Sequence, residues 1–192
     1  MKKGIPGIYA LVLSLNRKKA ITIGKLGRFT FEPGWYVYLG SAHAGGGVKA
    51  RTDRHRRVEK KLRWNVDHFR PHAALTEIWF SHDVHERECQ WAQALAGLRG
   101  ASVPVDGFGS HDCDCCPAHL IRLDQRPVAQ MLRHTLAAKY PEHEPIYVES
   151  LIPAEPSESE STMLQRYLRG NLYIEHRRRG VATALAEAAE RA

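Results

Sequence analysis

The first forty residues contain four segments typical of β-strands, joined by connections too short to hold a helix. Residues 7–15 are apolar, residues 34–40 are rich in aromatic and β-branched side chains, and two weaker segments lie at 20–24 and 28–31. Parallel strands need a crossover of about a dozen or more residues, so strands joined by such short connections pair antiparallel. The sequence therefore predicts a short antiparallel sheet at the start of the chain.

Three glycines at 45–47 separate these strands from a predicted helix with an unusual inward face. Five residues recur at three- and four-residue steps on one side of this helix: Val48, Arg51, His55, Val58 and Leu62. Because this side faces the core, the arginine and the histidine on it must be paired, hydrogen-bonded or used in chemistry. We therefore treat Arg51 and His55 as candidate functional residues.

The rest of the chain alternates strand-like and helix-like segments before its composition changes. The expected elements are strands at 76–80 and 119–123 and helices at 83–98 and 128–139. The first of these helices starts with Asp83, and Glu86 stands three residues on in capping-box position. The pattern predicts an α+β domain over residues 1–140, with a small, mainly antiparallel sheet flanked by helices. Residues 141–192 then form an acidic linker and a basic helical tail.

The positive charge of the chain is concentrated in one segment. The formal net charge is +7, and residues 41–63 hold eight lysines and arginines against Asp53 and Glu59. Such a run of charges is ordinarily the solvated face of a helix. Because few acids neutralise this one, the sharper interpretation is a surface that binds a phosphate backbone. Six of its cations are candidate nucleic-acid contacts: Lys49, Arg54, Arg56, Arg57, Lys60 and Lys61.

The compartment is predicted from what the sequence does not contain. No stretch of about 18 apolar residues is present, so we expect no membrane span. The apolar run near the N-terminus is interrupted by Pro6 and Gly7 and lacks a small-residue cleavage site. We therefore expect a cytoplasmic protein with no membrane partner.

Three motifs, in their order along the chain, resemble the GIY-YIG nuclease family. Gly7-Ile8-Tyr9 lies on the first predicted strand, Tyr38-Leu39-Gly40 on a later strand, and Arg51 and His55 on the helix that follows. An acidic residue in the next helix completes the pattern. The resemblance covers about residues 4–125 and is to a subgroup whose biochemical role is unassigned.

The resemblance implies a metal-dependent endonuclease that uses a single Mg²⁺ or Mn²⁺ ion. Tyr9 and Tyr38 would orient or deprotonate the attacking water, Arg51 would hold the scissile phosphate, and His55 would assist proton transfer. Glu88 would bind the metal, whereas Glu86 suits a capping role. The expected partner is nucleic acid, DNA rather than RNA, and whether there is a protein partner is left open.

Two departures from the family pattern keep a second function open. Residues 19–33 insert an extra hairpin between the two tyrosine motifs, and the family's late asparagine has no evident counterpart. These departures favour a nucleic-acid-binding module that keeps the fold but does not cleave.

A cysteine-rich loop lies near the end of the predicted domain. Cys113, Cys115, Cys116 and His119 offer ligands suited to zinc. Two ligands separated by a single residue, such as Cys113 and Cys115, rarely chelate one ion alone. We therefore expect buried cysteines here, with zinc at Cys113, Cys115 and His119 as the alternative.

The tail carries a second, shorter resemblance. Residues 172–174 and the Arg-rich turn at 177–185 are similar to the coenzyme-A loop of GNAT acetyltransferases. Too few residues remain to complete that fold. We expect a basic amphipathic helix here, and an acetyltransferase fragment is the third functional alternative.

Overall fold

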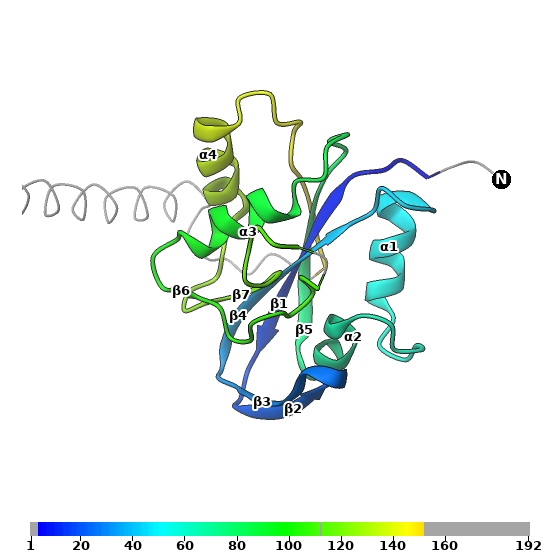
Figure 1. The fold of residues 1–192 in the computed structure, drawn as a ribbon, viewed down its shortest axis with the longest axis vertical. Coiled ribbons are helices and arrows are strands. Elements are labelled where there is room, and N and C mark those ends of the chain that lie inside the picture. Colours follow the sequence, from blue (N-terminus) through cyan, green and yellow to red (C-terminus); the bar gives the residue numbers. More distant parts are fainter. Residues whose placement is uncertain (1–3, 112, 152–192) are drawn as a thin grey trace, which may run out of the picture. The chain divides into compact units, whose positions relative to one another are not determined.

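Six strands form one sheet in the part of the chain that the computed structural model describes, residues 4–111 and 113–151. The strands are β1 (Ile8–Leu15), β4 (Gly34–Ser41), β5 (Ala74–Ser81), β6 (Ala101–Ser102), β7 (Leu120–Leu123) and β8 (Tyr147–Ser150). Their order in the sheet is β6-β7-β4-β1-β5-β8, and every neighbouring pair is antiparallel (Figure 1). The α+β class with a mainly antiparallel sheet is thus confirmed.

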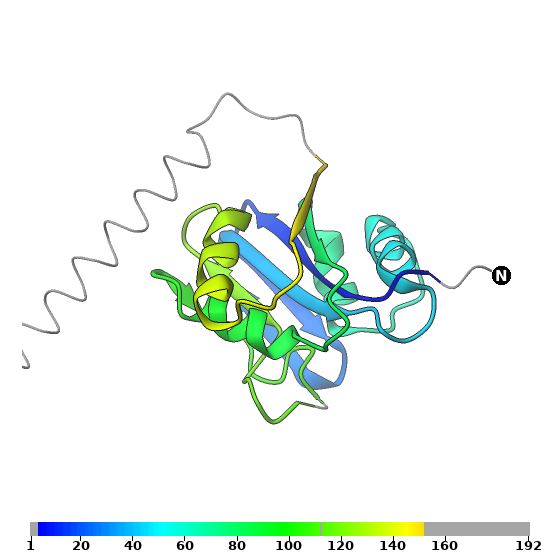
Figure 2. The ribbon, with the colours of Figure 1, turned by 90° about the horizontal axis from the view of Figure 1, so that it is seen from above.

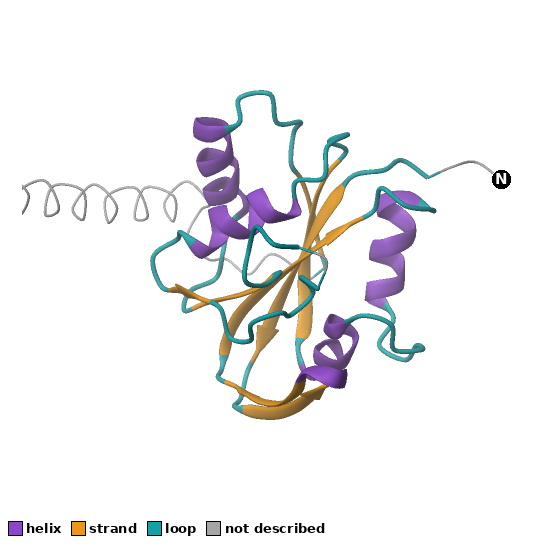
Figure 3. Cartoon of the chain, in the orientation of Figure 1, coloured by secondary structure: helices purple, strands orange, loops and turns teal. Residues whose placement is uncertain are grey.

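Four α-helices flank this sheet on both sides (Figures 1 and 3). They are α1 (Gly47–Arg56), α2 (Asn65–Phe69), α3 (Glu88–Ala96) and α4 (Ala129–Lys139). Short 3₁₀ turns lie at Gly24–Leu26 and Arg70–His72. Figure 2 shows α1 on one side of the sheet and the pair α3 and α4 on the other. Among the described residues, no helix combines the length and the apolar character that crossing a membrane requires.

The central strand β1 is buried because both of its faces are covered. Residues 8–13 are all buried. Leu11 and Leu13 pack in the main core with Val48 of α1 and Val66 of α2. The alternate positions of the strand face the opposite side. This explains why the sequence of β1 is apolar throughout and does not alternate.

The inserted hairpin is not part of the six-stranded sheet. Strands β2 (Lys19–Ile23) and β3 (Gly27–Phe31) pair only with each other, in a two-stranded sheet. Phe31 packs against Phe69 of α2, with 4.9 Å between the ring centroids. The insertion therefore leaves β1 and β4 free to pair directly, although we expected these four strands to form one sheet.

Helix α1 is shorter than its sequence pattern predicts. The pattern extended to Leu62, but the helix ends at Arg56, and Val58 and Leu62 are exposed. After the helix the chain turns so that cations on either side of the turn contact the buried carboxylate of Asp67. Charge pairing over a long sequence separation thus overrides the local helical pattern.

Helix α3 begins five residues later than predicted. Asp83 does not cap it with Glu86; instead its carboxylate accepts a hydrogen bond from the backbone of His85 and another from Arg87. Asp83 is buried, and Glu86 is exposed. The loop before the helix is therefore organised by its own polar network, and Glu88 becomes the first helical residue.

The sheet also contains a strand that the sequence analysis did not predict. β8 lies at the edge of the sheet and pairs with β5, from Phe80 opposite Tyr147 to Glu77 opposite Ser150. All four residues of β8 are exposed, so no apolar pattern marks them. The predicted acidic stretch and the turn that resembles a coenzyme-A loop lie outside the described residues.

Candidate functional site

The two tyrosines of the sequence motifs lie on neighbouring strands and on the same face of the sheet. Tyr9 of β1 pairs with Gly40 of β4, and Leu11 pairs with Tyr38. The tyrosines are therefore diagonal neighbours, which brings long side chains within reach of each other. A Cβ atom on Gly40 would lie 2.4 Å from the Tyr9 hydroxyl oxygen, so Tyr9 occupies space that only a glycine opposite it leaves free.

A buried hydrogen bond joins Tyr9 to His55. The tyrosine Oη lies 2.9 Å from Nε2 of His55, which stands in the last turn of α1. Burial lowers the pKa of His55 to about 3, and burial also raises the pKa of Tyr9. Both groups are thus neutral at pH 7, and the tyrosine O–H donates to Nε2. From this hydrogen bond we assign the imidazole proton to Nδ1, which lies 3.8 Å from a carboxylate oxygen of Asp67.

Asp67 of α2 lies next to the imidazole of this pair and is itself completely buried. Arg54 donates to both of its oxygens at 3.0 and 2.9 Å, and Lys60 lies 2.9 Å from one of them. Burial opposes ionisation, but the hydrogen bonds from Arg54 and Lys60 outweigh it and hold the pKa of Asp67 well below its usual range. Arg54 and Lys60, predicted from sequence as nucleic-acid contacts, are therefore engaged within the protein.

Arg51 is held beside the tyrosines by an aromatic ring. Its guanidinium carbon lies 4.5 Å from the centroid of Trp64, which also stacks near His55. Its positive charge opposes the pKa elevation of Tyr9 and of Tyr38, so it lies within electrostatic range of both. We call Tyr9, Tyr38, Arg51 and His55 the tyrosine–histidine site.

Glu88 faces this site from the start of α3. Its side chain is half-buried, and burial followed by the nearby charge of Glu86 raises its pKa. A hydrogen bond from the Ser41 backbone and the positive charge of Arg51 act in the opposite direction. Of the two acids considered from sequence, Glu88 is therefore the one placed beside the tyrosine–histidine site.

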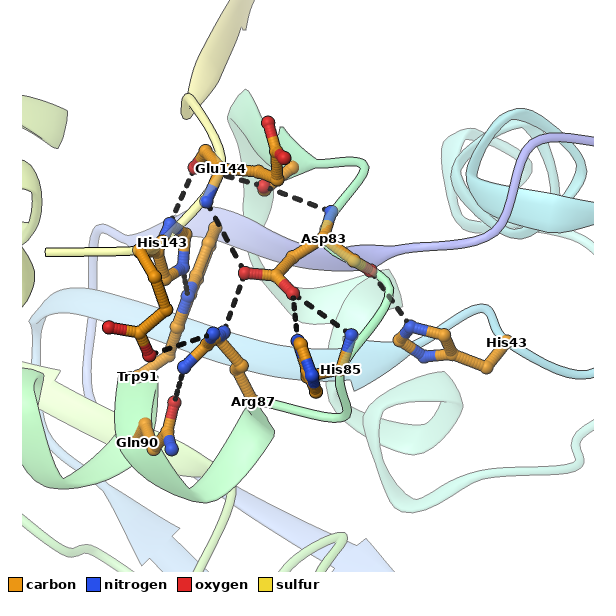
Figure 4. A network of polar contacts seen from close by, with 10 residues as sticks. His43, Asp83, His85, Arg87, Gln90, Trp91, His143 and Glu144 are labelled. Atoms are coloured by element: carbon orange, nitrogen blue, oxygen red, sulfur yellow. Dashed lines mark hydrogen bonds and ion pairs between the residues drawn. The ribbon is translucent and has the colours of Figure 1, made fainter. Parts of the chain in front are cut away.

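His43 is a neighbour that the sequence did not single out. Its Nδ1 lies 2.9 Å from the hydroxyl of Ser41, and its Nε2 lies 3.0 Å from the carbonyl of Asp83 (Figure 4). It joins the end of β4 to the loop before α3. No spacing rule indicated this contact, because the partners come from elements forty residues apart.

A polar network fixes the first turn of α3 and with it the position of Glu88. Arg87 is buried and donates to Asp83 at 2.5 Å and to Gln90 at 2.9 Å (Figure 4). Trp91 donates to His143 at 2.7 Å. Burial opposes ionisation of Asp83, but hydrogen bonds from the His85 backbone and from Arg87 lower its pKa to about 2.

Four side chains of types that can bind metals meet beside Glu88. The ligand atoms of Cys89, Cys113, Cys116 and His119, which we call the cysteine cluster, all lie within 4.8 Å of one another. These four residues could hold a metal ion, and sulfur and imidazole donors suit zinc rather than Mg²⁺ or Mn²⁺. The expectation of simply buried cysteines is therefore revised.

Cys115, which the sequence analysis included in the zinc alternative, lies outside the cysteine cluster. It is exposed and forms a disulfide with Cys89. A pocket of about 570 Å³ lies between Glu88 and the loop that carries these cysteines. Glu88 and the cysteine cluster thus border the same pocket.

The remaining cations of the basic segment have different surroundings. Lys49 pairs with Asp53 at 2.5 Å, and Arg56 pairs with Asp53 and with Glu149. Arg57 and Lys61 are exposed, and their side chains have no polar partner among residues 4–111 and 113–151. Of the six predicted contacts, these two are the most available to a phosphate.

Comparison with known proteins gives one match. A family model with the description "Domain of unknown function DUF123" matches residues 8–140, from the start of β1 to the end of α4. No curated protein and no solved structure matches the chain. The matched segment contains the whole tyrosine–histidine site, Glu88 and the cysteine cluster.

Proposed function

This chain belongs to the family described as domain of unknown function DUF123, and we propose that it is a metal-dependent endonuclease of GIY-YIG type that hydrolyses phosphodiester bonds in nucleic acid. One observation carries the proposal. Tyr9, Tyr38, Arg51, His55 and Glu88, which come from four elements, gather around one end of the sheet. Hydrolysis of a phosphodiester needs a proton acceptor near water, a cation at the phosphate and an oxygen ligand for a divalent ion.

The Tyr9–His55 pair supplies the proton acceptor. As water attacks phosphorus, Tyr9 Oη takes a proton from the water and passes its own proton to Nε2 of His55, 2.9 Å away. The resulting imidazolium faces the carboxylate of Asp67, which favours the charged form. The resting pKa of about 3 makes His55 a weak base, but the negative charge of a bound phosphate raises that pKa.

Arg51 supplies the positive charge. Stacking on Trp64 holds the guanidinium in place, so little reorganisation is needed when charge develops on the phosphate oxygens. Tyr38 lies within electrostatic range of Arg51 and Glu88, and burial keeps its hydroxyl protonated as a hydrogen-bond donor.

Glu88 is the residue that would hold the divalent ion. Mg²⁺ in nucleotide and nucleic-acid sites is commonly bound through one or two carboxylates together with substrate phosphates. A half-buried carboxylate whose pKa is raised by burial fits this role, because a bound cation would offset the cost of burying its negative charge. The ion, when bound, would stabilise the leaving oxygen as a Lewis acid.

A nucleic-acid-binding module without cleavage is the second candidate. It is favoured by the segment 101–125, which contains the cysteine-rich loop and no asparagine. In this case Arg57 and Lys61 would still contact phosphates, and the tyrosine–histidine site would be structural.

The test is a cleavage assay of the full chain on branched, flapped, duplex and single-stranded nucleic acids, with Mg²⁺, with Mn²⁺ and with EDTA. Glu88→Gln should abolish cleavage and preserve nucleic-acid binding, because it removes an anion near a polyanion. Loss of one such charge lowers the rate by about 10²- to 10³-fold.

The matched control is Glu86→Gln, two residues before Glu88 in the loop that precedes α3. We expect it to cut at nearly the wild-type rate, because Glu86 is exposed. Binding without cleavage under every metal condition would instead support the binding module.

A further inference from the structure

The donors of the cysteine cluster come from two elements that the fold brings together. Cys89 lies in the first turn of α3, and the other three residues lie in the loop before β7. The Sγ atoms of Cys89 and Cys113 are 2.9 Å apart, and those of Cys113 and Cys116 are 3.3 Å apart. A tetrahedral zinc ion with Zn–S bonds of about 2.3 Å holds its sulfur ligands roughly 3.8 Å apart. A small outward movement of the thiols would therefore accommodate the ion.

His119 has the surroundings of a metal-binding histidine. Its side chain is buried, and its Nε2 atom has no hydrogen-bond partner among the described residues. A hydrogen bond to the Gly109 backbone engages the ring on its other side. Metal-binding histidines typically donate one ring N–H to a backbone carbonyl and present the other nitrogen to the ion. A buried polar atom with no partner is costly unless something binds it.

We propose that Cys89, Cys113, Cys116 and His119 bind one structural Zn²⁺ ion, and that this site forms only when the Cys89–Cys115 disulfide is reduced. Three thiolates and one imidazole fill the four positions that structural zinc prefers, so no position remains for a substrate. The site is separate from Glu88 and from the ion proposed there.

Cys116 is assigned as a ligand in preference to its neighbour Cys115. Cys116 is buried within the cluster, whereas Cys115 is exposed. Cys113 and Cys116 also form a C-x-x-C pair, a usual spacing for zinc ligands. The zinc alternative predicted from the sequence used Cys113 and Cys115 and did not include this pair.

The disulfide and the zinc site exclude each other because both use the sulfur of Cys89. A dithiol reductant transfers two electrons and two protons to the disulfide, which gives the Cys89 and Cys115 thiols and leaves the reductant as a cyclic disulfide. Cys89 then loses its proton as it binds zinc. The reduced protein holds the ion, and the oxidised protein does not.

Zinc would also fix the loop that borders the tyrosine–histidine site. Gly109 of this loop adopts a φ of +77°, and a Cβ atom there would lie 3.0 Å from the Tyr38 ring. Cys89 directly follows Glu88 in the chain. The ion would therefore hold in place both Glu88 and the loop that contacts Tyr38. This holds whether or not the chain is a nuclease.

The test measures metal content and needs no activity assay. The full chain without a polyhistidine tag is reduced with a dithiol, loaded with Zn²⁺, freed of excess metal and analysed for elemental zinc. We expect one equivalent, and much less when the disulfide is left intact. Co²⁺ loaded in place of Zn²⁺ should give the thiolate charge-transfer absorption of a site with three sulfur ligands.

Substitutions of two neighbouring cysteines, one outside the proposed site and one inside it, form a matched pair of variants. Cys115→Ser should keep one equivalent of zinc and no longer need the reductant. Cys116→Ser should weaken zinc binding by more than the roughly 10- to 100-fold typical of residues that only support a ligand.

The proposal is overturned if the reduced wild type binds neither zinc nor cobalt. It is also overturned if Cys115→Ser loses the metal while Cys116→Ser keeps it. If Cys116→Ser does not fold, the cobalt spectrum of Cys115→Ser decides the assignment, because a site that keeps three sulfur ligands without Cys115 must use Cys116.

Discussion

The tyrosine–histidine site is built from side chains that contact one another directly, whereas the cysteine cluster gathers sulfur and imidazole donors that could hold an ion. Tyr9 bonds to His55, and Arg51 stacks on Trp64, with Asp67 behind them. In the cysteine cluster the thiols admit either a disulfide or an ion. Each region also holds one buried imidazole nitrogen without a hydrogen-bond partner among the described residues, Nδ1 of His55 in the first and Nε2 of His119 in the second.

The difference shows how two neighbouring regions of one domain reach order by different routes. Burial and charge pairing determine the first region, because a buried charge such as that of Asp67 is costly unless it is paired. The second region depends on an added ion or on oxidation, since its thiols form few strong bonds with each other. Substitutions should therefore disrupt the first region through folding stability and the second through metal content.

The largest effect is expected from Asp67→Ala, which removes the acid that supports the tyrosine–histidine site. Arg54 and Lys60 would be left without their buried partner, at a cost of about 3 to 5 kcal/mol of unfolding free energy. Urea denaturation at pH 7 measures this loss of unfolding free energy.

The control for Asp67→Ala is Asp53→Asn, which removes exposed pairs with Lys49 and Arg56 and should cost less than about 1 kcal/mol. Equal losses in the two variants would mean that the first region is not held by its buried carboxylate.

A steric change at Gly40 should disturb the same region by a smaller amount. In Gly40→Ala the new Cβ would meet the Tyr9 hydroxyl at 2.4 Å, so the ring must move away from His55. Such overpacking costs about 1 to 3 kcal/mol.

Gly97→Ala, at the end of α3 in the other region, meets only ordinary contacts and should change the unfolding free energy by less than about 1 kcal/mol. Thermal melting of both variants makes this comparison, and a larger loss at Gly97 would contradict the close packing inferred at Gly40.

The pH dependence of stability should test the burial of His55 in the first region. The pKa of His55 is about 3 in the folded protein against an ordinary value of 6.5. Between these values the unfolded chain binds a proton that the folded protein does not, so stability falls as pH drops. One such group contributes a slope of up to about 1.4 kcal/mol per pH unit.

Comparing wild type with His55→Gln by urea denaturation at several pH values between about 5 and 6.5 isolates this contribution, because ordinary carboxyl groups titrate below that range. The variant should show the shallower slope. Identical slopes would mean that His55 is not kept neutral by burial.

The smallest expected effect concerns which region faces nucleic acid. Replacing Arg57 and Lys61 with Gln should shallow the plot of log affinity against log salt by about 0.9 for each lost phosphate contact on duplex DNA. Asp114→Asn, in the cysteine-rich loop, should leave this slope unchanged. A slope that responds only to the Asp114 change would move the binding surface to the second region.

Elements with a strong local pattern could be predicted from the sequence to within one or two residues. β1 and β4 are marked by apolar and aromatic runs, and α4 by its periodicity. The same patterns placed Tyr9 and Tyr38 on strands and Arg51 and His55 on one helix face, and the structure brings these four residues together.

Features that depend on distant partners could not be predicted in this way. The end of α1 follows from pairing with Asp67, and the late start of α3 follows from the Asp83–Arg87 pair and the contacts of residues 142–144. The cysteine cluster could not be predicted because one of its members, Cys89, is 24 residues from Cys113 in the chain. Only the C-x-x-C spacing of Cys113 and Cys116 was available as a sequence signal.

The most direct test of the proposed nuclease site is the single-turnover cleavage rate of Tyr9→Phe with Mg²⁺ or Mn²⁺. The substitution removes only the hydroxyl that bonds to His55, and the ring keeps its place against Gly40. We predict a rate lower by about 10²- to 10⁴-fold, with nucleic-acid affinity nearly unchanged. Cleavage by Tyr9→Phe at the wild-type rate would contradict the role given to the Tyr9–His55 pair.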